Sequence, residues 1–223
     1  MKADTQLYSE IMEKLEFEPL INPINITVSI HGGIVTLAGV VGQYTEKRAV
    51  ERAVRSVKGV KGIANELEVN LADCLKRSDM DITQSALNAL EWNANVPFEN
   101  IQVTVEDGNI KLTGEVTWWY ERQNAEKAVR NLIGVKNIIN QIKVKPETPM
   151  VSTTEVKEKI AKEFSHNALI DAQGIRVEVS GSKITLIGQV KSWAEYKEAN
   201  RAVWSIPGVR DVDNQLQISS DIA

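Results

Sequence analysis

The chain is poor in the residues that form disulfides and metal sites. Its single cysteine, Cys74, cannot form a disulfide within the chain. Only two histidines are present, His31 and His166, and no spacing of His and Asp residues recurs. The motif His31-Gly-Gly33 lacks the Gly-x-Ser-x-Gly of a hydrolase and is typical of a turn. We therefore expect no metal, no cofactor and no catalytic residue, which predicts a protein that is not an enzyme.

Long apolar runs and an excess of basic charge are missing as well. No stretch of 18 apolar residues could span a membrane as a helix. The formal net charge is −4 and is spread evenly along the chain, so the basic surface of a nucleic-acid-binding protein is not predicted. The first residues include acids where a signal peptide has its apolar core. These features predict a soluble cytoplasmic protein, or a periplasmic one if the chain is a processed form.

What the chain does contain is a unit that occurs three times. Leu37, Leu112 and Leu186 are 75 and 74 residues apart, which indicates repeats longer than those of most solenoids. The same steps relate two sets of glycines and one set of asparagines: Gly39, Gly114 and Gly188; Gly59, Gly134 and Gly208; Asn65, Asn140 and Asn214. We predict three small domains, residues 1–72, 81–145 and 153–223, hereafter repeats 1, 2 and 3. Residues 73–80 and 146–152 are the predicted linkers.

Each repeat opens with a helical pattern and continues as a β-hairpin. Apolar residues recur every four positions in the first segment, as in Leu7, Ile11 and Leu15 of repeat 1. Residues 26–30 and 35–41 then alternate between apolar and polar, which is typical of strands with one buried face. The turns between them carry Gly-Gly, Asp-Gly or Gly-Ser, and Gly and Asp tolerate the positive φ angles of short hairpins.

A second amphipathic helix and a last strand complete the unit. Val50, Ala53 and Val54 lie on one face of the predicted helix, and Gly59, Gly134 and Gly208 are predicted to end this helix in the three repeats as C′ residues. The order α-β-β-α-β places the last two strands parallel. We therefore predict an α+β fold of three tandem domains, each a three-stranded mixed sheet packed against two helices.

The recurring pattern V-x-L-x-G-x-V, followed by a helix, Gly-Val and an asparagine, resembles the bacterial OsmY and nodulation (BON) domain. In repeat 2 the pattern comprises Ile110, Leu112, Gly114 and Val116, then 134–135 and Asn140. The resemblance covers nearly the whole chain. It implies a bacterial protein of the osmotic or envelope stress response, without enzymatic activity, that associates with phospholipid surfaces.

The aromatic cluster Trp118-Trp119-Tyr120 is the candidate contact surface. Tyr44 and Trp193 stand where Trp119 does, so Trp119 is interpreted as an aromatic that packs the hairpin against the second helix. Trp118 has no aromatic equivalent, and an exposed Trp suits a lipid headgroup layer or a protein interface. Trp92 and Trp204 are interpreted as core or interdomain residues. The candidate partners are an anionic phospholipid surface, other proteins, or further copies of this chain in a self-assembling, transport-associated scaffold.

Overall fold

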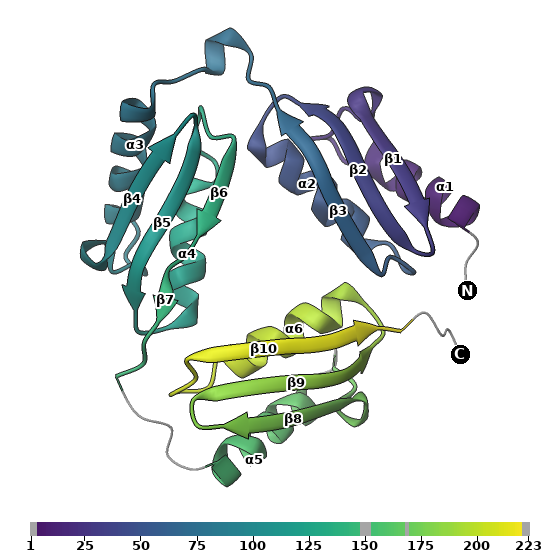
Figure 1. The fold of residues 1–223 in the computed structure, drawn as a ribbon, viewed down its shortest axis with the longest axis vertical. Helices are drawn as coiled ribbons and strands as arrows, with labels where there is room; N and C mark the ends of the chain where they lie inside the picture. Colours follow the sequence, from purple (N-terminus) through teal and green to yellow (C-terminus); the bar gives the residue numbers. More distant parts are fainter. Residues whose placement is uncertain (1–3, 148–152, 168–169, 220–223) are drawn as a thin grey trace. The chain divides into compact units, whose positions relative to one another are not determined.

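The computed structural model describes residues 4–147, 153–167 and 170–219, and it has the predicted fold of three tandem α-β-β-α-β units (Figure 1). Repeat 1 contains α1 (Asp4–Glu16), β1 (Ile26–His31), β2 (Ile34–Val41), α2 (Tyr44–Ser56) and β3 (Gly62–Val69). Repeat 2 contains α3 (Asp79–Glu91), β4 (Ile101–Glu106), β5 (Asn109–Val116), α4 (Trp119–Val129), β6 (Asn137–Asn140) and β7 (Lys143–Val144). Repeat 3 contains α5 (Thr153–His166), β8 (Ile175–Ser180), β9 (Lys183–Val190), α6 (Trp193–Trp204) and β10 (Asp211–Ile218).

All three sheets are mixed, and the hairpin forms two of their strands. In repeat 1, β1 pairs antiparallel with β2, and β2 pairs parallel with β3. Repeat 3 has the same arrangement with β8, β9 and β10. A short 3₁₀ helix precedes the first strand of each repeat: η1 (Pro23–Asn25), η3 (Phe98–Asn100) and η4 (Ala172–Gly174). The last two strands are joined through a helix, as parallel neighbours require.

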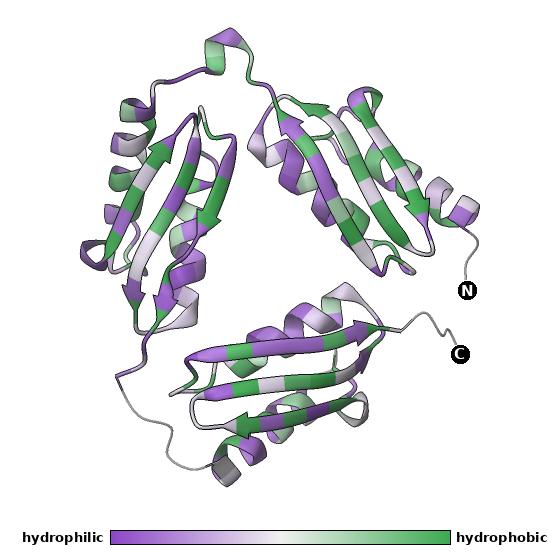
Figure 2. Cartoon of the chain, in the orientation of Figure 1, coloured by the Kyte–Doolittle hydropathy of each residue, from purple (hydrophilic) through white to green (hydrophobic). Residues whose placement is uncertain are grey.

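The helix stripes predicted from the sequence form the core of each repeat. Leu7, Ile11 and Leu15 are buried along α1, where they join Val35 and Leu37 of β2. The equivalent stripes are buried in α3 (Ile82, Ala86 and Leu90) and in α5 (Val156, Ile160 and Phe164). Apolar and polar residues alternate along the strands in Figure 2, so each sheet buries one face against its helices.

The glycines of the hairpins are required by the backbone. Gly39, Gly114 and Gly188 have φ angles of +121°, +135° and +139°. A Cβ atom added to any of them would overlap the carbonyl oxygen of the residue that precedes the paired strand; for Gly39 this residue is Asn25. Only glycine satisfies both conditions, which explains why this position recurs unchanged.

The second set of glycines has a different role from the one predicted. Helix α2 ends at Ser56, α4 at Val129 and α6 at Trp204, several residues before Gly59, Gly134 and Gly208, so the prediction that these glycines are C′ residues is wrong. After α2, the amide of Val57 donates to Val54 O in a tighter turn, which ends the helix early. The glycines have φ angles of +105°, +94° and +89° and lie in the turn that leads into the last strand.

Repeat 2 differs from the others in its last strand. The strand is divided into β6 and β7, both of which pair with β5. At the interruption, the Arg122 guanidinium donates to Asn140 O at 3.2 Å, and the Asn140 amide donates to Arg122 O at 2.9 Å. The side-chain oxygen of Asn140 also accepts from Ile142 N at 3.2 Å. Arg122 thus contacts the backbone of the strand at the residue where β6 ends.

The described chain divides into two compact units. One unit comprises repeat 1 and most of repeat 2. It runs up to Val116 and continues over Tyr120–Lys143. The other holds repeat 3 together with Thr117–Trp119. Each unit is treated separately below. Residues 148–152 of the predicted second linker lie outside the described residues.

Candidate functional site

Two of the most exposed large apolar side chains among the described residues lie where the first helix of a repeat ends. Trp92, the C-cap residue of α3, is 88% exposed, and Phe17, just after α1, is 84% exposed. The two residues are 75 positions apart and therefore equivalent in repeats 1 and 2. The interpretation of Trp92 as a core or interdomain residue is wrong, because the buried stripe of α3 ends at Leu90 and Trp92 falls outside it.

Each of these positions opens a loop that carries further exposed apolar residues. Leu20 and Ile24 are exposed in repeat 1, and Phe98 is exposed to a smaller extent in repeat 2. We call residues 17–25 loop 1 and residues 92–100 loop 2. In repeat 3 the equivalent first position is His166, which is also exposed. Repeats 1 and 2 thus present apolar side chains at a place where repeat 3 presents a polar one.

A carboxylate holds loop 1 to the start of the second helix. Glu46, the third residue of α2, accepts from Asn22 N at 3.0 Å and from Gly42 N at 2.8 Å. Inside the loop, Asn22 Oδ1 accepts from Ile24 N, and the side chain of Ile21 is buried. These contacts fix the backbone while Phe17 and Ile24 stay exposed, so the apolar side chains project from an ordered loop.

The same bridge is present in repeat 3 and is more deeply buried. Glu195 is 4% exposed and accepts from Asp171 N at 2.7 Å and from Lys191 N at 2.6 Å. Ser192 caps the helix by accepting from Glu195 N. Glu121 holds the third position of α4 in repeat 2. Sequence reasoning missed this carboxylate, although its recurrence and the capping-box pattern Ser192-x-x-Glu195 could have revealed it.

A second carboxylate connects the first helix to the hairpin turn. Asp79, the first residue of α3, accepts from Asp107 N and from Gly108 N, both at 2.9 Å. Asp4 accepts from Gly32 N in repeat 1. Farther along the chain, the Arg201 guanidinium beside Glu198 lowers the pKa of that carboxyl, which also accepts from the Asn167 amide.

The aromatic cluster predicted as the contact surface is only partly exposed. Trp118 is half-buried, so the exposed tryptophan of this protein is Trp92. Tyr120 is 50% exposed. Trp119 is half-buried and begins α4, and its ring stacks on that of Trp204, with centroids 6.1 Å apart and an interplanar angle of 6°. Trp204 also packs against the core of repeat 3, as predicted.

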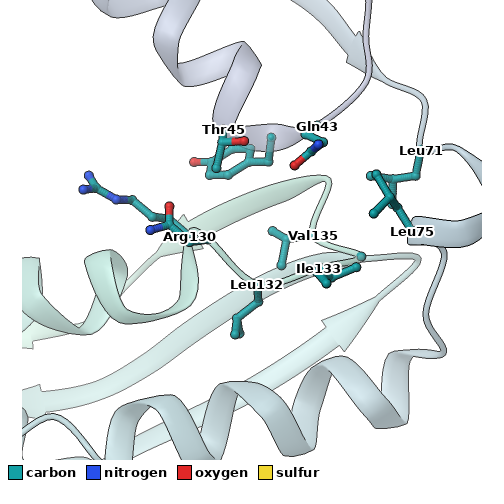
Figure 3. A pocket seen from close by; sticks show the side chains of 11 residues that line it. Gln43, Thr45, Leu71, Leu75, Arg130, Leu132, Ile133 and Val135 are labelled. Atoms are coloured by element: carbon teal, nitrogen blue, oxygen red, sulfur yellow. The ribbon is translucent and has the colours of Figure 1, made fainter. Parts of the chain in front are cut away.

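A small cavity lies in the unit that contains repeats 1 and 2 (Figure 3). Its volume is about 30 Å³, and it is lined by the start of α2, by Leu71 and Leu75, and by residues 130–135. Ligand sites for organic molecules are roughly ten times larger, whereas this volume suits one or two water molecules. Tyr44 lines the cavity and is 6% exposed, and its burial raises the pKa of its hydroxyl.

Two further features of the described residues bear on binding. No described helix is long and apolar enough to cross a membrane. Within the same part of the chain, no group of three or more His, Cys, Asp and Glu side chains could hold a metal ion.

Comparison with known families places these features in context. The model of the BON domain matches residues 3–70, 78–146 and 152–220. The chain belongs to the BON domain family. One BON relative is the osmotically-inducible protein Y of Escherichia coli K12, which is 24% identical over 148 residues, covering 64% of this chain and 73% of that protein.

Among solved structures, the C-terminal domain of CdsD, a structural protein of the type III secretion system of Chlamydia trachomatis, is 15% identical, with a TM-score of 0.26 over 97% of this chain and 98% of that one. The PrgH periplasmic domain is 8% identical, with a TM-score of 0.22 over 93% of this chain and 99% of that one. At such TM-scores the likeness supports no conclusion about assembly or partners.

Proposed function

We propose that this chain is a non-catalytic binding protein of the osmotic or envelope stress response, and that it contacts phospholipid surfaces through loops 1 and 2. The observation that carries the proposal is the pair of equivalent, exposed aromatic side chains Phe17 and Trp92. An aromatic ring with an exposed apolar body suits the interfacial layer of a bilayer. The name of the Escherichia coli relative supports the link to osmotic stress. The cytoplasmic location stays a prediction.

The recurring polar residues support a binding role over a catalytic one. Glu46 and Glu195 each accept two backbone hydrogen bonds within their own repeats. The side-chain oxygens of the recurring asparagines accept from the amide two residues further on in all three repeats, as Asn65 does from Leu67 N. The recurrence of these residues is therefore explained by the fold, and we assign contact with a partner to the exposed loops.

The charges beside the aromatic residues indicate which surface they would enter. Glu16 and Glu18 flank Phe17, and Glu91 precedes Trp92. An anionic membrane repels these carboxylates, so attraction would come from apolar burial. We therefore expect neutral phosphatidylcholine vesicles to bind at least as tightly as vesicles that contain phosphatidylglycerol. This refines the anionic surface expected from the family resemblance.

Vesicle flotation with the full chain tests the proposal. Burying about half of a tryptophan that covers roughly 200 Å² contributes on the order of 2 kcal/mol. Trp92→Ala is therefore expected to weaken binding about tenfold or more. Phe17→Ala is expected to act in the same direction with a smaller effect. His166→Ala, at the equivalent position of repeat 3, is the matched control and should bind like the wild type. Absence of binding to both vesicle types, or unchanged binding of Trp92→Ala, contradicts the proposal.

The second candidate is a scaffold that assembles through its repeats. Each sheet has outer strands on both sides, as the order β1-β2-β3 shows, and outer strands can pair with another chain. If this candidate is right, light scattering after size exclusion should give a mass that rises with concentration. A monomer at the highest concentration reached would exclude the scaffold and leave the lipid proposal standing.

A further inference from the structure

One face of the sheet of repeat 1 lies away from both helices of that repeat. Helices α1 and α2 pack on the other face, where Val35 and Leu37 of β2 are buried (Figure 1). Successive side chains of a strand point to opposite faces, so the residues that alternate with these two share the first face, which we call the open face. Two of them are large and apolar: Ile34 is 53% exposed and Val40 is 42% exposed.

The other two repeats carry charged residues at these same positions. Lys183 of repeat 3 stands where Ile34 does, and its ammonium group lies 3.2 Å from the carboxylate of Asp213 on the neighbouring strand. Glu115 of repeat 2 stands where Val40 does. Charged side chains on a sheet are one means by which proteins prevent association with other chains. Repeats 2 and 3 have this protection, whereas the hairpin positions of the open face in repeat 1, all of them described, include no Lys, Arg, Asp or Glu.

The shape of the open face is complementary to a second copy of itself. Along β2 the order is Ile34, Thr36, Ala38 and Val40, with the larger apolar side chains at the two ends. If the β2 strands of two copies face each other in opposite directions, Ile34 of one copy meets Val40 of the other, and the smaller residues meet between them. Sheets pack face to face in this way at a separation of about 10 Å.

The charges at the edge of the open face favour the same direction. Glu68 of β3 is the strand partner of Val40, and Glu66 precedes it on the same face. His31 of β1 is the strand partner of Ile34, at the opposite end. Opposed strands therefore place the carboxylates of one copy toward the His31 end of the other. Strands that run in the same direction would bring the carboxylates of both copies to one end, where they repel each other.

We propose that the open face of repeat 1 binds the open face of a second copy of this chain, with the two β2 strands in opposite directions. An interface in which the same surface is used by both partners closes at a dimer. With strands about 4.8 Å apart and about seven residues of 3.3 Å on each, the three-stranded face measures roughly 15 Å by 25 Å. Two such faces would bury on the order of 1,000 Å² in total, the lower limit of a specific interface, so the dimer is weak and reversible.

Sedimentation equilibrium of the full chain, from about 1 µM to about 1 mM, tests the proposal over the range of dissociation constants expected of a small interface. The wild type should show monomers and dimers in reversible exchange. Ile34→Lys and Val40→Glu should each weaken the dimer at least tenfold, because every dimer would bury the new charge twice. The fold accepts both changes, since Lys183 and Glu115 hold these positions in the other repeats. Gln189→Lys adds a lysine to the equivalent face of repeat 3 and should dimerise like the wild type.

A mixture of the two variants tests the direction of the strands. When Ile34→Lys and Val40→Glu chains are combined in equal amounts, opposed strands set the introduced ammonium group against the introduced carboxylate and leave the second Ile34–Val40 contact intact. The mixture should therefore dimerise more tightly than either variant alone. Strands that run in the same direction would give no such recovery, and its absence overturns the proposed arrangement.

The dimer is independent of the proposed contact with phospholipid. Trp92→Ala changes a side chain outside the open face, so it should weaken vesicle binding and leave the dimer unchanged. A wild type that stays monomeric up to about 1 mM, or one that grows beyond a dimer, overturns the proposal. So does an Ile34→Lys chain that dimerises like the wild type. A monomeric wild type whose vesicle binding is reduced by Ile34→Lys would instead identify the open face as a lipid-binding surface.

Discussion

Gly39→Ala is expected to unfold repeat 1 under conditions in which the wild type is folded. The alanine would have to adopt a φ angle of +121°, and its Cβ would overlap the carbonyl oxygen of Asn25. That oxygen belongs to the main chain of the residue just before β1, so it cannot turn aside as a side chain could. Backbone strain of this kind costs about 1–3 kcal/mol, and displacement of the strand adds to it. A loss of about 4 kcal/mol or more approaches the whole stability of a small domain.

Gly32→Ala in the same repeat is the matched control. Gly32 also has a positive φ angle, +59°, but an added Cβ would meet no atom within 4 Å. Its substitution should therefore cost only about 1 kcal/mol, the price of the left-handed conformation alone. Hydrogen exchange of peptides from β1 and β2 would localise the effect, since repeat 1 contains no tryptophan. Equal losses for Gly39→Ala and Gly32→Ala would contradict the steric argument.

The interior of each repeat could be predicted because its contacts follow the chain at short, regular spacings. Leu7, Ile11 and Leu15 lie one helical turn apart and are all buried. The alternation along β1 and β2 gives the buried face of the hairpin in the same way. Three copies in register strengthened each of these patterns, since a residue required by the backbone, such as Gly39, is present in all of them.

Contacts between distant segments were harder to predict. Glu46 accepts from an amide 24 residues away, and no local pattern predicts such a bond. The end of the second helix differs from the prediction, because Gly59 has the sequence context of a C′ residue although the helix ends at Ser56. Trp92 is exposed although an aromatic beside a helix stripe is typical of a core residue, because it stands two positions beyond Leu90, the last buried residue of that stripe.

Recurrence therefore separates two kinds of residue in this chain. Residues that are the same in all three repeats, such as the hairpin glycines, satisfy the fold. Where the side chain at one position differs among the repeats, the shared fold does not require it, and it is available for contacts outside the repeat. Phe17, Trp92 and His166 occupy one position with three different side chains, two of them apolar. The search for function belongs at such positions.

Glu195→Ala is expected to destabilise repeat 3 by about 3 kcal/mol. Both carboxylate oxygens accept from main-chain amides, at 2.7 Å from Asp171 N and 2.6 Å from Lys191 N, in a site that is 4% exposed. Hydrogen bonds to a charged group contribute about 1.5–3 kcal/mol, and the two amides would be left without their acceptor. The carboxylate also lies in the first turn of α6, where the helix dipole favours negative charge.

Two variants make the Glu195 prediction specific. Glu195→Gln keeps one acceptor oxygen but presents an NH₂ group to the second amide, so about half of the loss is expected. Glu178→Ala removes an exposed carboxylate from β8 of the same repeat and should change stability by less than about 0.5 kcal/mol. The change in stability of each of the three variants is obtained from its urea midpoint, measured by hydrogen exchange of peptides from β8 and β9. If Glu195→Ala proves no more destabilising than Glu178→Ala, the buried carboxylate does not hold the loop before β8 to the start of α6, and another contact must do so.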